Sequence, residues 1–291
     1  MELRSLGPGA ADVTCVGFGG MPLSTSGRPD EADSVRVLHA ALDAGMTLID
    51  TANVYCMDDR DIGHNERLIA RALREWSGDA DGIVVATKGG MTRPAGRWDR
   101  DARPESLEAA CEASLAALGV EAIDLYQLHA PDPRVPLEDS VGALADLRTA
   151  GKIRAVGLSN VSVDEIQRAS AIVPITSVQN RLSPFFREAI DGGVVGHTAA
   201  EGMGFLAYSP VGGGRLNRKL PDHPVVASIA RDRGVSPHAV VLAWVMGLSP
   251  NVLVIPGART IPHALDSIAA ADLDLTPSET EAIEGAEFSV A

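Results

Sequence analysis

The chain has 291 residues, of which 45% are hydrophobic and 22% charged, and its formal net charge is −14 at pH 7. These values are typical of a globular protein with enough apolar material for a closed core, and the acidic balance makes nucleic acids and anionic membranes poor partners. Three scattered cysteines without metal-site spacing, no signal peptide and no apolar stretch of membrane-spanning length together predict a cytoplasmic protein without structural zinc.

Short apolar or β-branched runs recur along the chain, and a helical pattern follows each of them. Eight such runs are predicted strands: residues 14–18, 47–50, 83–87, 125–129, 153–158, 177–179, 205–208 and 252–255. They are short and nearly continuously apolar, as buried parallel strands are. An eightfold alternation of strand and helix indicates a parallel α/β fold.

The helices between these strands have recognisable ends, with proline near the start or glycine beyond the end. In chain order they are marked by residues 34–43, 65–76, the stretch from Pro104 to Gly119, residues 136–150, Asp164, Glu188, Pro237 and Pro262.

Two sheet arrangements are compatible with this alternation. No GxGxxG motif follows the first strand, so the open dinucleotide-binding sheet lacks its fingerprint. Eight similar units without a linker favour a (β/α)8 TIM barrel, an α/β fold with a single domain over residues 1–291. Residues 2–6 are expected to form a strand of a small plug below the barrel.

Polar residues close three neighbouring strands, where the active sites of such barrels lie. Asp50, Lys88 and His129 end the second, third and fourth strands, and Tyr55 follows Asp50 in the next loop. Taken singly, Asp50 fits a helix cap, Tyr55 fits loop packing, and His129 fits a hydrogen-bonded core residue. Lys88 follows a run of apolar or small residues, where its charge must be paired, and Asp50 is the natural partner.

Together these four side chains predict general-acid catalysis. A tyrosine pKa near about 10 makes a poor acid, and a nearby ammonium is expected to lower the pKa of Tyr55. Asp50 would hold Lys88 charged, and His129 would donate a hydrogen bond to a substrate oxygen. The set would protonate a carbonyl as hydride arrives, without any metal.

Over almost its whole length the chain resembles the aldo-keto reductase family. The matching segments are GFGGM, LIDTANVY, IVVATKGG, LYQLHAPDP, GKIRAVGLSN, SVQNRLSP, LAYSPVGGG and VIPGAR. The resemblance implies NADPH-dependent reduction of an aldehyde or ketone to an alcohol. It also matches Asp50, Tyr55, Lys88 and His129 to the family's catalytic tetrad, with the tyrosine as acid.

The resemblance further implies a set of cofactor contacts. Ser159, Asn160 and Gln179 match the residues that bind the nicotinamide carboxamide, and Tyr208 matches the ring stacked under the nicotinamide. The other matched positions lie in the pyrophosphate-crossing loop or after the last strand: Ser209, Gly212, Gly214, Arg215, Gly257 and Arg259. Arg259 is expected to contact the adenosine 2′-phosphate, which favours NADPH. Asp266 and Ser267 replace the Glu-Asn pair that many members have near the adenosine.

The substrate is expected to be a small carbonyl compound. By their positions after the first three strands, Met21, Asn53, Val54 and Trp98 are predicted to line its pocket, and Trp98 fits a surface residue of an ordered loop equally well. Only about 35 residues follow the last strand, so no long C-terminal segment is expected over the substrate. The sequence does not specify an oligomeric state.

Two other functions fit parts of the pattern. A catalytically weak NADPH-binding regulatory subunit would retain the cofactor segments but would not need the tyrosine acid. A Schiff-base lyase would use Lys88 as its nucleophile, but would leave the segments SPVGGGR and IPGAR without a role.

Overall fold

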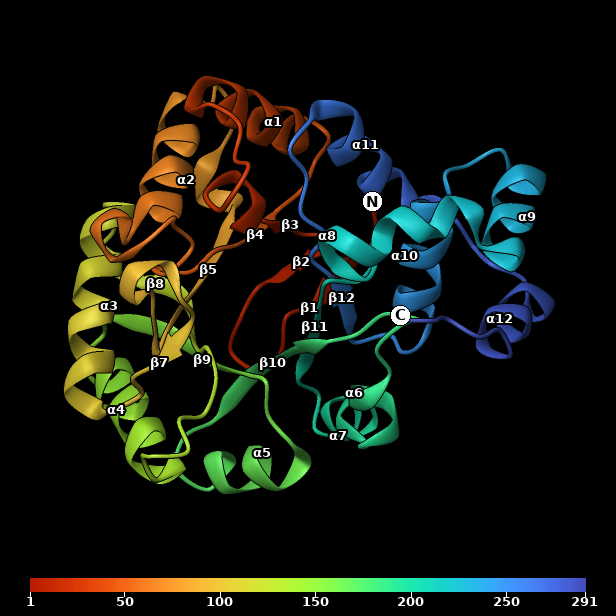
Figure 1. Ribbon diagram of the computed structural model, residues 1–291. Helices are drawn as coiled ribbons and strands as arrows, with labels where there is room; N and C mark the ends of the chain where they lie inside the picture. The colour runs from red at the N-terminus through yellow and green to blue at the C-terminus, as the bar shows by residue number, and fades with distance from the viewer.

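The apolar runs form one eight-stranded parallel sheet in the computed structural model, which describes residues 1–291 (Figure 1). The barrel strands are β3 (Phe18–Gly19), β4 (Leu48–Asp50), β5 (Val84–Gly89), β8 (Ile123–Leu128), β9 (Ile153–Ser159), β10 (Ile175–Arg181), β11 (Gly204–Tyr208) and β12 (Val252–Val254). Each hydrogen-bonds to the next in this order. The ends of the sheet meet through a parallel bridge between Val16 and Val254, so the sheet closes and the predicted (β/α)8 barrel is confirmed.

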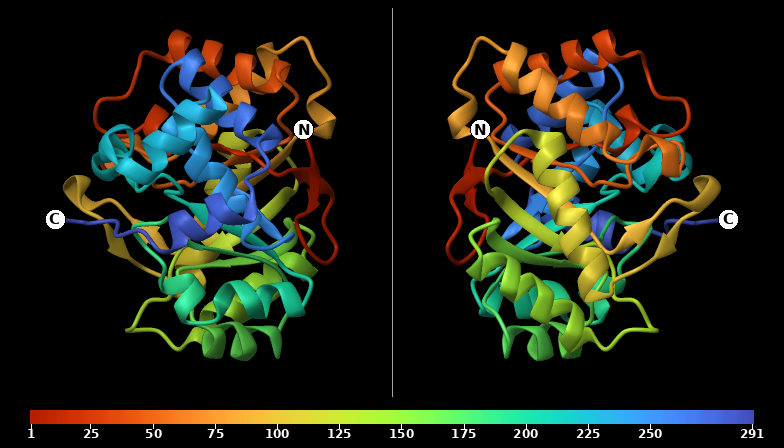
Figure 2. Two further views of the ribbon diagram at one scale, coloured as in Figure 1. Left: turned by 90° about the vertical axis from the view of Figure 1, so that its right-hand side faces the viewer. Right: turned by 90° about the vertical axis from the view of Figure 1, so that its left-hand side faces the viewer.

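The first barrel strand differs from its predicted range of 14–18. Residues up to Thr14 belong to β2 (Asp12–Thr14), which pairs antiparallel with β1 (Leu3–Ser5), and only Phe18 and Gly19 pair with β4. This hairpin is the predicted plug. Figure 2 shows it at one end of the barrel, with the C-terminus at the opposite end.

The plug closes the barrel because it buries side chains in the interior. Leu6 and Val13 are fully buried in the cluster that also contains Leu48, Leu125 and Leu206 from the strands. Burying such side chains stabilises the fold by about 1.5–3 kcal/mol each.

The helices surround the strands (Figures 1 and 2). They are α1 (Glu31–Asp43), α2 (His64–Glu75), α3 (Pro104–Leu118), α4 (Leu137–Thr149), α5 (Val163–Ser170), α6 (Glu188–Asp191), α7 (Val194–Ala200), α8 (Gly213–Leu216), α9 (Pro224–Arg233), α10 (Pro237–Gly247), α11 (Ile261–Ala269) and α12 (Pro277–Glu284). The end signals act as expected, since Pro104 begins α3 and Gly119, with φ of 71°, ends it. None of the helices combines the length and the apolar character needed to cross a membrane.

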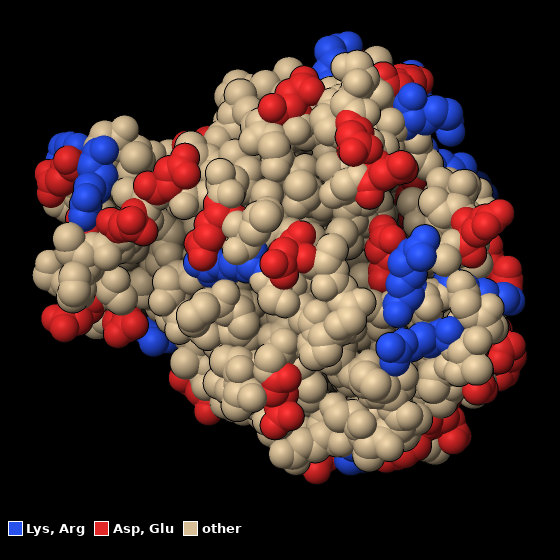
Figure 3. Space-filling model, turned by 180° about the vertical axis from the view of Figure 1, so that it is seen from behind, with Lys and Arg blue, Asp and Glu red and all other residues tan.

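Charged side chains of both signs are interspersed on the face seen from behind Figure 1 (Figure 3). No continuous basic surface covers that face, in keeping with the acidic net charge.

Candidate active site

The polar site follows from the two-residue period of the strands. Leu48, Ala86 and Leu125 face the barrel interior, and the inward positions two residues further along their strands are Asp50, Lys88 and Gln127. Asp50 pairs with Ala86 in the β4–β5 register. The last inward position of each of these three strands is therefore polar. The three side chains converge at the carboxyl ends of the strands.

Lys88 and Asp50 form the ion pair expected from the sequence. The Lys88 ammonium donates to both carboxylate oxygens of Asp50 at 2.7 Å and to the Thr51 carbonyl at 2.8 Å. Lys88 is 0% exposed, and this burial lowers its pKa while the charge of Asp50 opposes that effect. The site thus holds a charged pair whose net charge is close to zero.

Tyr55 is the third member of this cluster. The Lys88 ammonium donates to its hydroxyl oxygen at 3.1 Å. Burial, and next the charge of Asp50, raises the pKa of Tyr55 well above its usual value. The lowering expected from the ammonium is wrong, because Asp50 neutralises that ammonium and water is excluded. Tyr55 therefore keeps its proton at neutral pH.

His129 follows β8 and faces Tyr55. The two rings are edge to face, with centroids 5.8 Å apart, and the His129 Nδ1 is buried without a hydrogen-bond partner. Burial, with a smaller effect of the Lys88 charge, lowers the pKa of His129 well below its usual value. The imidazole is therefore neutral and can donate a single N–H.

Two glutamines support Asp50 from neighbouring strands. Gln179 donates to Asp50 Oδ1 at 2.7 Å, and Gln127 donates to the same oxygen at 3.4 Å. The two amides also contact each other at 3.3 Å. Gln179, expected at the nicotinamide, thus has a partner within the cluster. Gln127 was missed in the sequence, although an amide between apolar residues in LYQLH is the signal that marks it.

Asn160 links the histidine loop to Tyr208. It has φ of 60°, its amide donates to the His129 carbonyl at 2.9 Å, and its Oδ1 accepts from the Tyr208 hydroxyl at 2.7 Å. The Asn160 amide also contacts the hydroxyl of buried Ser159 at 3.1 Å. The ends of β9 and β11 therefore form one hydrogen-bonded shelf beside the cluster.

The loop after β11 is shaped by backbone conformation. Ser209 and Gly212 have φ of 50° and 88°, and a Cβ on Gly212 would lie 2.7 Å from the Phe185 ring, so glycine is required there. A Cβ on Gly214 would meet nothing within 4 Å, so this backbone is open. Arg215 donates to the Val290 carbonyl near the C-terminus.

The residues after β12 contact the first loop, which comprises residues 20–30 between β3 and α1. A Cβ on Gly257 would lie 2.5 Å from the Pro22 side chain, so this glycine permits close packing. Arg259 is exposed, and it donates to the carbonyls of Pro22 at 3.1 Å and Ser26 at 2.7 Å. Asp266 accepts a 2.7 Å hydrogen bond from Ser236, which ties α11 to α10.

The predicted pocket residues lie in different environments. Trp98 lies edge-on to Tyr55 and His129, with ring centroids 6.5 and 6.4 Å away, and Met21 is exposed. Val54 is fully buried and packs with Tyr55, so its place on the pocket wall stays a prediction.

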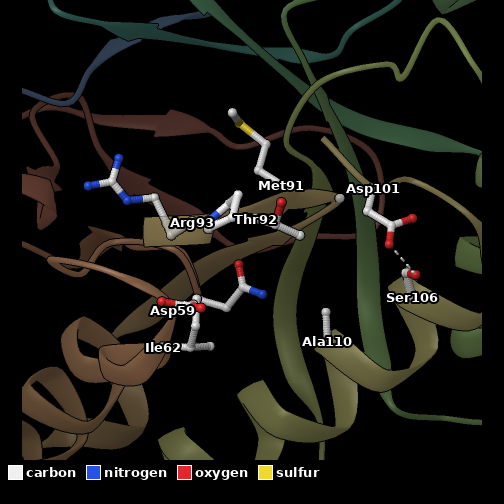
Figure 4. Close-up of a pocket in the computed structure, with 11 residues that line it drawn as sticks. Asp59, Ile62, Met91, Thr92, Arg93, Asp101, Ser106 and Ala110 are labelled. Carbon is white, nitrogen blue, oxygen red and sulfur yellow. Dashed lines mark hydrogen bonds between the residues drawn. The ribbon is translucent and has the colours of Figure 1, made fainter. Parts of the chain in front are cut away.

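A cavity of about 300 Å³ lies between residues of the segments 53–62, 90–94 and 101–110 (Figure 4). It is lined by Asn53, Asp59, Ile62, Gly90, Met91, Thr92, Arg93, Pro94, Asp101, Ser106 and Ala110. Asn53 thus faces this cavity, whereas Asp50, Tyr55, Lys88 and His129 do not line it. No group of His, Cys, Asp and Glu side chains in the structure is arranged to hold a metal ion.

Known proteins are similar to this chain over almost its whole length. A family model described as the aldo/keto reductase family matches residues 15–287. The aldo-keto reductase str7 of Strobilurus tenacellus is 34% identical over an alignment 319 positions long, which covers 97% of this chain and 91% of that protein. The glycerol dehydrogenase AKR11B4 of Gluconobacter oxydans has a TM-score of 0.83 at 29% identity, covering 97% and 94% of the two chains. An aldo/keto reductase of Klebsiella pneumoniae in complex with NADP and acetate has a TM-score of 0.82 at 27% identity, covering 98% and 95%.

Proposed function

The chain belongs to the aldo/keto reductase family, and from this premise we propose that it reduces an aldehyde or ketone to an alcohol with NADPH, using Tyr55 as the general acid. One observation carries the proposal. The Tyr55 hydroxyl lies 3.1 Å from the ammonium of Lys88, which in turn binds both oxygens of Asp50. A protonated phenol held beside a buried cation is suited to protonating an oxygen on which negative charge develops.

Each of the four side chains has a separate role in the proposed reaction. The neutral imidazole of His129 donates a hydrogen bond to the carbonyl oxygen and orients it. Tyr55 gives its proton to that oxygen, because an alkoxide is a stronger base than tyrosinate even when the tyrosine pKa is raised. Lys88 stabilises the tyrosinate that remains. Asp50, fixed by Gln179, holds Lys88 in place.

The described residues fit a nicotinamide dinucleotide, which when bound supplies a hydride to the carbonyl carbon. Tyr208 presents a half-buried ring on the shelf formed with Asn160, and this ring is suited to stacking against a flat heterocycle. The uncovered backbone at Gly214 suits a phosphate, and the N-terminus of α11 lies beside Arg259. The Klebsiella pneumoniae relative, which holds NADP, supports the same choice for this chain.

The experiment that tests the proposal is a screen of NADPH consumption over a panel of aldehydes and ketones, followed by single-turnover oxidation of bound NADPH. An NADPH-binding regulatory subunit would bind the nucleotide without oxidising it at a useful rate. Such a result would overturn the proposed enzyme activity.

A Schiff-base lyase is disfavoured by one structural feature. The Lys88 nitrogen has four oxygen atoms within 3.1 Å for its three N–H donors and is fully buried, so it is not placed as a free nucleophile. Borohydride should therefore trap no carbonyl substrate on Lys88. Trapping at this residue would favour the lyase.

A further inference from the structure

A short hairpin carries Trp98 over the catalytic cluster. Its strands, β6 (Met91–Thr92) and β7 (Asp99–Arg100), pair through two residues each. So short a ribbon is marginally stable by itself. Trp98, which is 47% exposed, nevertheless lies edge-on to both Tyr55 and His129. Another contact must therefore fix its position.

Arg93, at the other end of the same turn, supplies that contact. Its guanidinium carbon lies 4.0 Å from the centre of the Trp98 ring system, which is a close cation–π distance. Its Nη2 donates to the carbonyls of Cys56 and Met57, both at 3.2 Å. These carbonyls directly follow Tyr55 in the chain, so one side chain joins Trp98 to the loop that carries Tyr55.

The burial of Arg93 is not explained by charge pairing. The side chain is only 7% exposed, forms no ion pair, and leaves its Nε and Nη1 buried without partners. Burying a cation without a carboxylate is costly. The side chain lines the cavity and contacts the Trp98 ring, the two carbonyls after Tyr55 and the Cys56 thiol.

We propose that Arg93 is a positioning residue that fixes Trp98 relative to Tyr55 and His129, and thereby determines how well the site holds an aromatic carbonyl substrate. This inference rests on the proposed function, because it places the carbonyl between Tyr55 and His129. An aromatic aldehyde extends its ring from the carbonyl onto the indole, whereas acetaldehyde does not reach it. Arg93 therefore affects selectivity and not the chemical step.

The test compares Arg93→Met with Arg97→Met, a matched control in the same turn whose side chain is exposed. NADPH oxidation is measured with benzaldehyde and with acetaldehyde. Arg93→Met should raise KM for benzaldehyde about fivefold or more, with kcat changed less than about twofold and acetaldehyde kinetics unchanged. Arg97→Met should match the wild type. Equal losses on both aldehydes would overturn the inference.

The variant Trp98→Leu shows whether Arg93 affects the KM for benzaldehyde through Trp98. Trp98→Leu should itself raise KM for benzaldehyde, and adding Arg93→Met should then have no further effect. An undiminished effect of Arg93→Met in the Trp98→Leu background would mean that Arg93 acts through the Tyr55 loop instead.

The variant Arg93→Lys controls for misfolding, and the wild-type activity tests the proposed function on which the inference rests. Arg93→Lys keeps the buried charge but lacks the planar face, so it should show the same selective rise in KM with an unchanged thermal melt. Wild-type kinetics for Arg93→Lys would contradict the proposed stacking role. A wild-type protein that reduces neither aldehyde would overturn the proposed function itself, which is a distinct result.

Discussion

Lys88 and Asp50 form a buried ion pair, and the ammonium of the same lysine also donates to the Tyr55 hydroxyl at 3.1 Å. Burial, and next the charge of Asp50, raises the pKa of Tyr55. The pair therefore keeps the acid protonated before reaction and stabilises its anion afterwards.

Replacing Tyr55 with phenylalanine should remove the general acid and leave the ring packing in place. Loss of a general acid lowers the rate by roughly 10²–10⁴-fold. The measurement is kcat for aldehyde reduction, with NADPH affinity followed by fluorescence titration and expected to stay nearly unchanged. Full turnover in Tyr55→Phe would remove Tyr55 from the mechanism.

Replacing Asp50 with asparagine should destabilise the fold as well as the chemistry. It leaves the fully buried Lys88 ammonium without its counter-ion, and breaking such a pair costs about 3–5 kcal/mol. The free energy of unfolding by urea measures the loss. Lys152→Met removes one partner of the exposed pair with Glu112 and should change little by comparison. Similar effects of both variants would mean that Lys88 is neutral in the folded protein.

The pH dependence of kcat/KM should be flat across the neutral range. The pKa of Tyr55 is raised, so the acid loses its proton only at a pH above the ordinary tyrosine value of about 10. The pKa of His129 is lowered, so the imidazole stays neutral below its ordinary value of about 6.5. A rate profile between pH 6 and 9 checks both directions. An inflection near pH 6.5 that His129→Gln abolishes would show that His129 titrates normally.

Most of the barrel and the central ion pair could be predicted from the sequence because they depend on local patterns. The two-residue strand period and the strand order place Asp50 beside Lys88. The first strand was displaced because β1 recruits residues up to Thr14, a pairing that apolar periodicity does not encode. The direction of the Tyr55 pKa shift depends on burial and next on the charge of Asp50, and the sequence shows neither the burial nor the distance.

The hydrogen-bond partners of Arg259 and Arg215 could not be predicted from the sequence either. Arg259 binds carbonyls of Pro22 and Ser26, more than 200 residues earlier in the chain, and Arg215 binds a carbonyl near the C-terminus. Backbone carbonyls carry no residue-type signal. The sequence therefore indicated that both arginines are free to bind phosphate. In the structure both donate hydrogen bonds to backbone carbonyls.

Replacing Arg259 with alanine should weaken NADPH binding much more than NADH binding. Arg259 is exposed next to the N-terminus of α11, and its hydrogen bonds to the Pro22 and Ser26 carbonyls hold it there. A charged hydrogen bond to the 2′-phosphate contributes roughly 1.5–3 kcal/mol, so NADPH affinity should fall about tenfold or more.

Fluorescence titration with both nucleotides checks this prediction, and the exposed Arg74 on α2 gives a matched control with the same change in net charge. Arg74→Ala should leave both affinities unchanged, because its charge lies on the far end of a helix and is screened by salt. Equal losses of NADPH and NADH affinity in Arg259→Ala would mean that the residue supports the first loop through its two carbonyl contacts and does not bind the 2′-phosphate. Loss of NADPH affinity alone, diminishing at high salt, is the expected outcome for a direct charge contact.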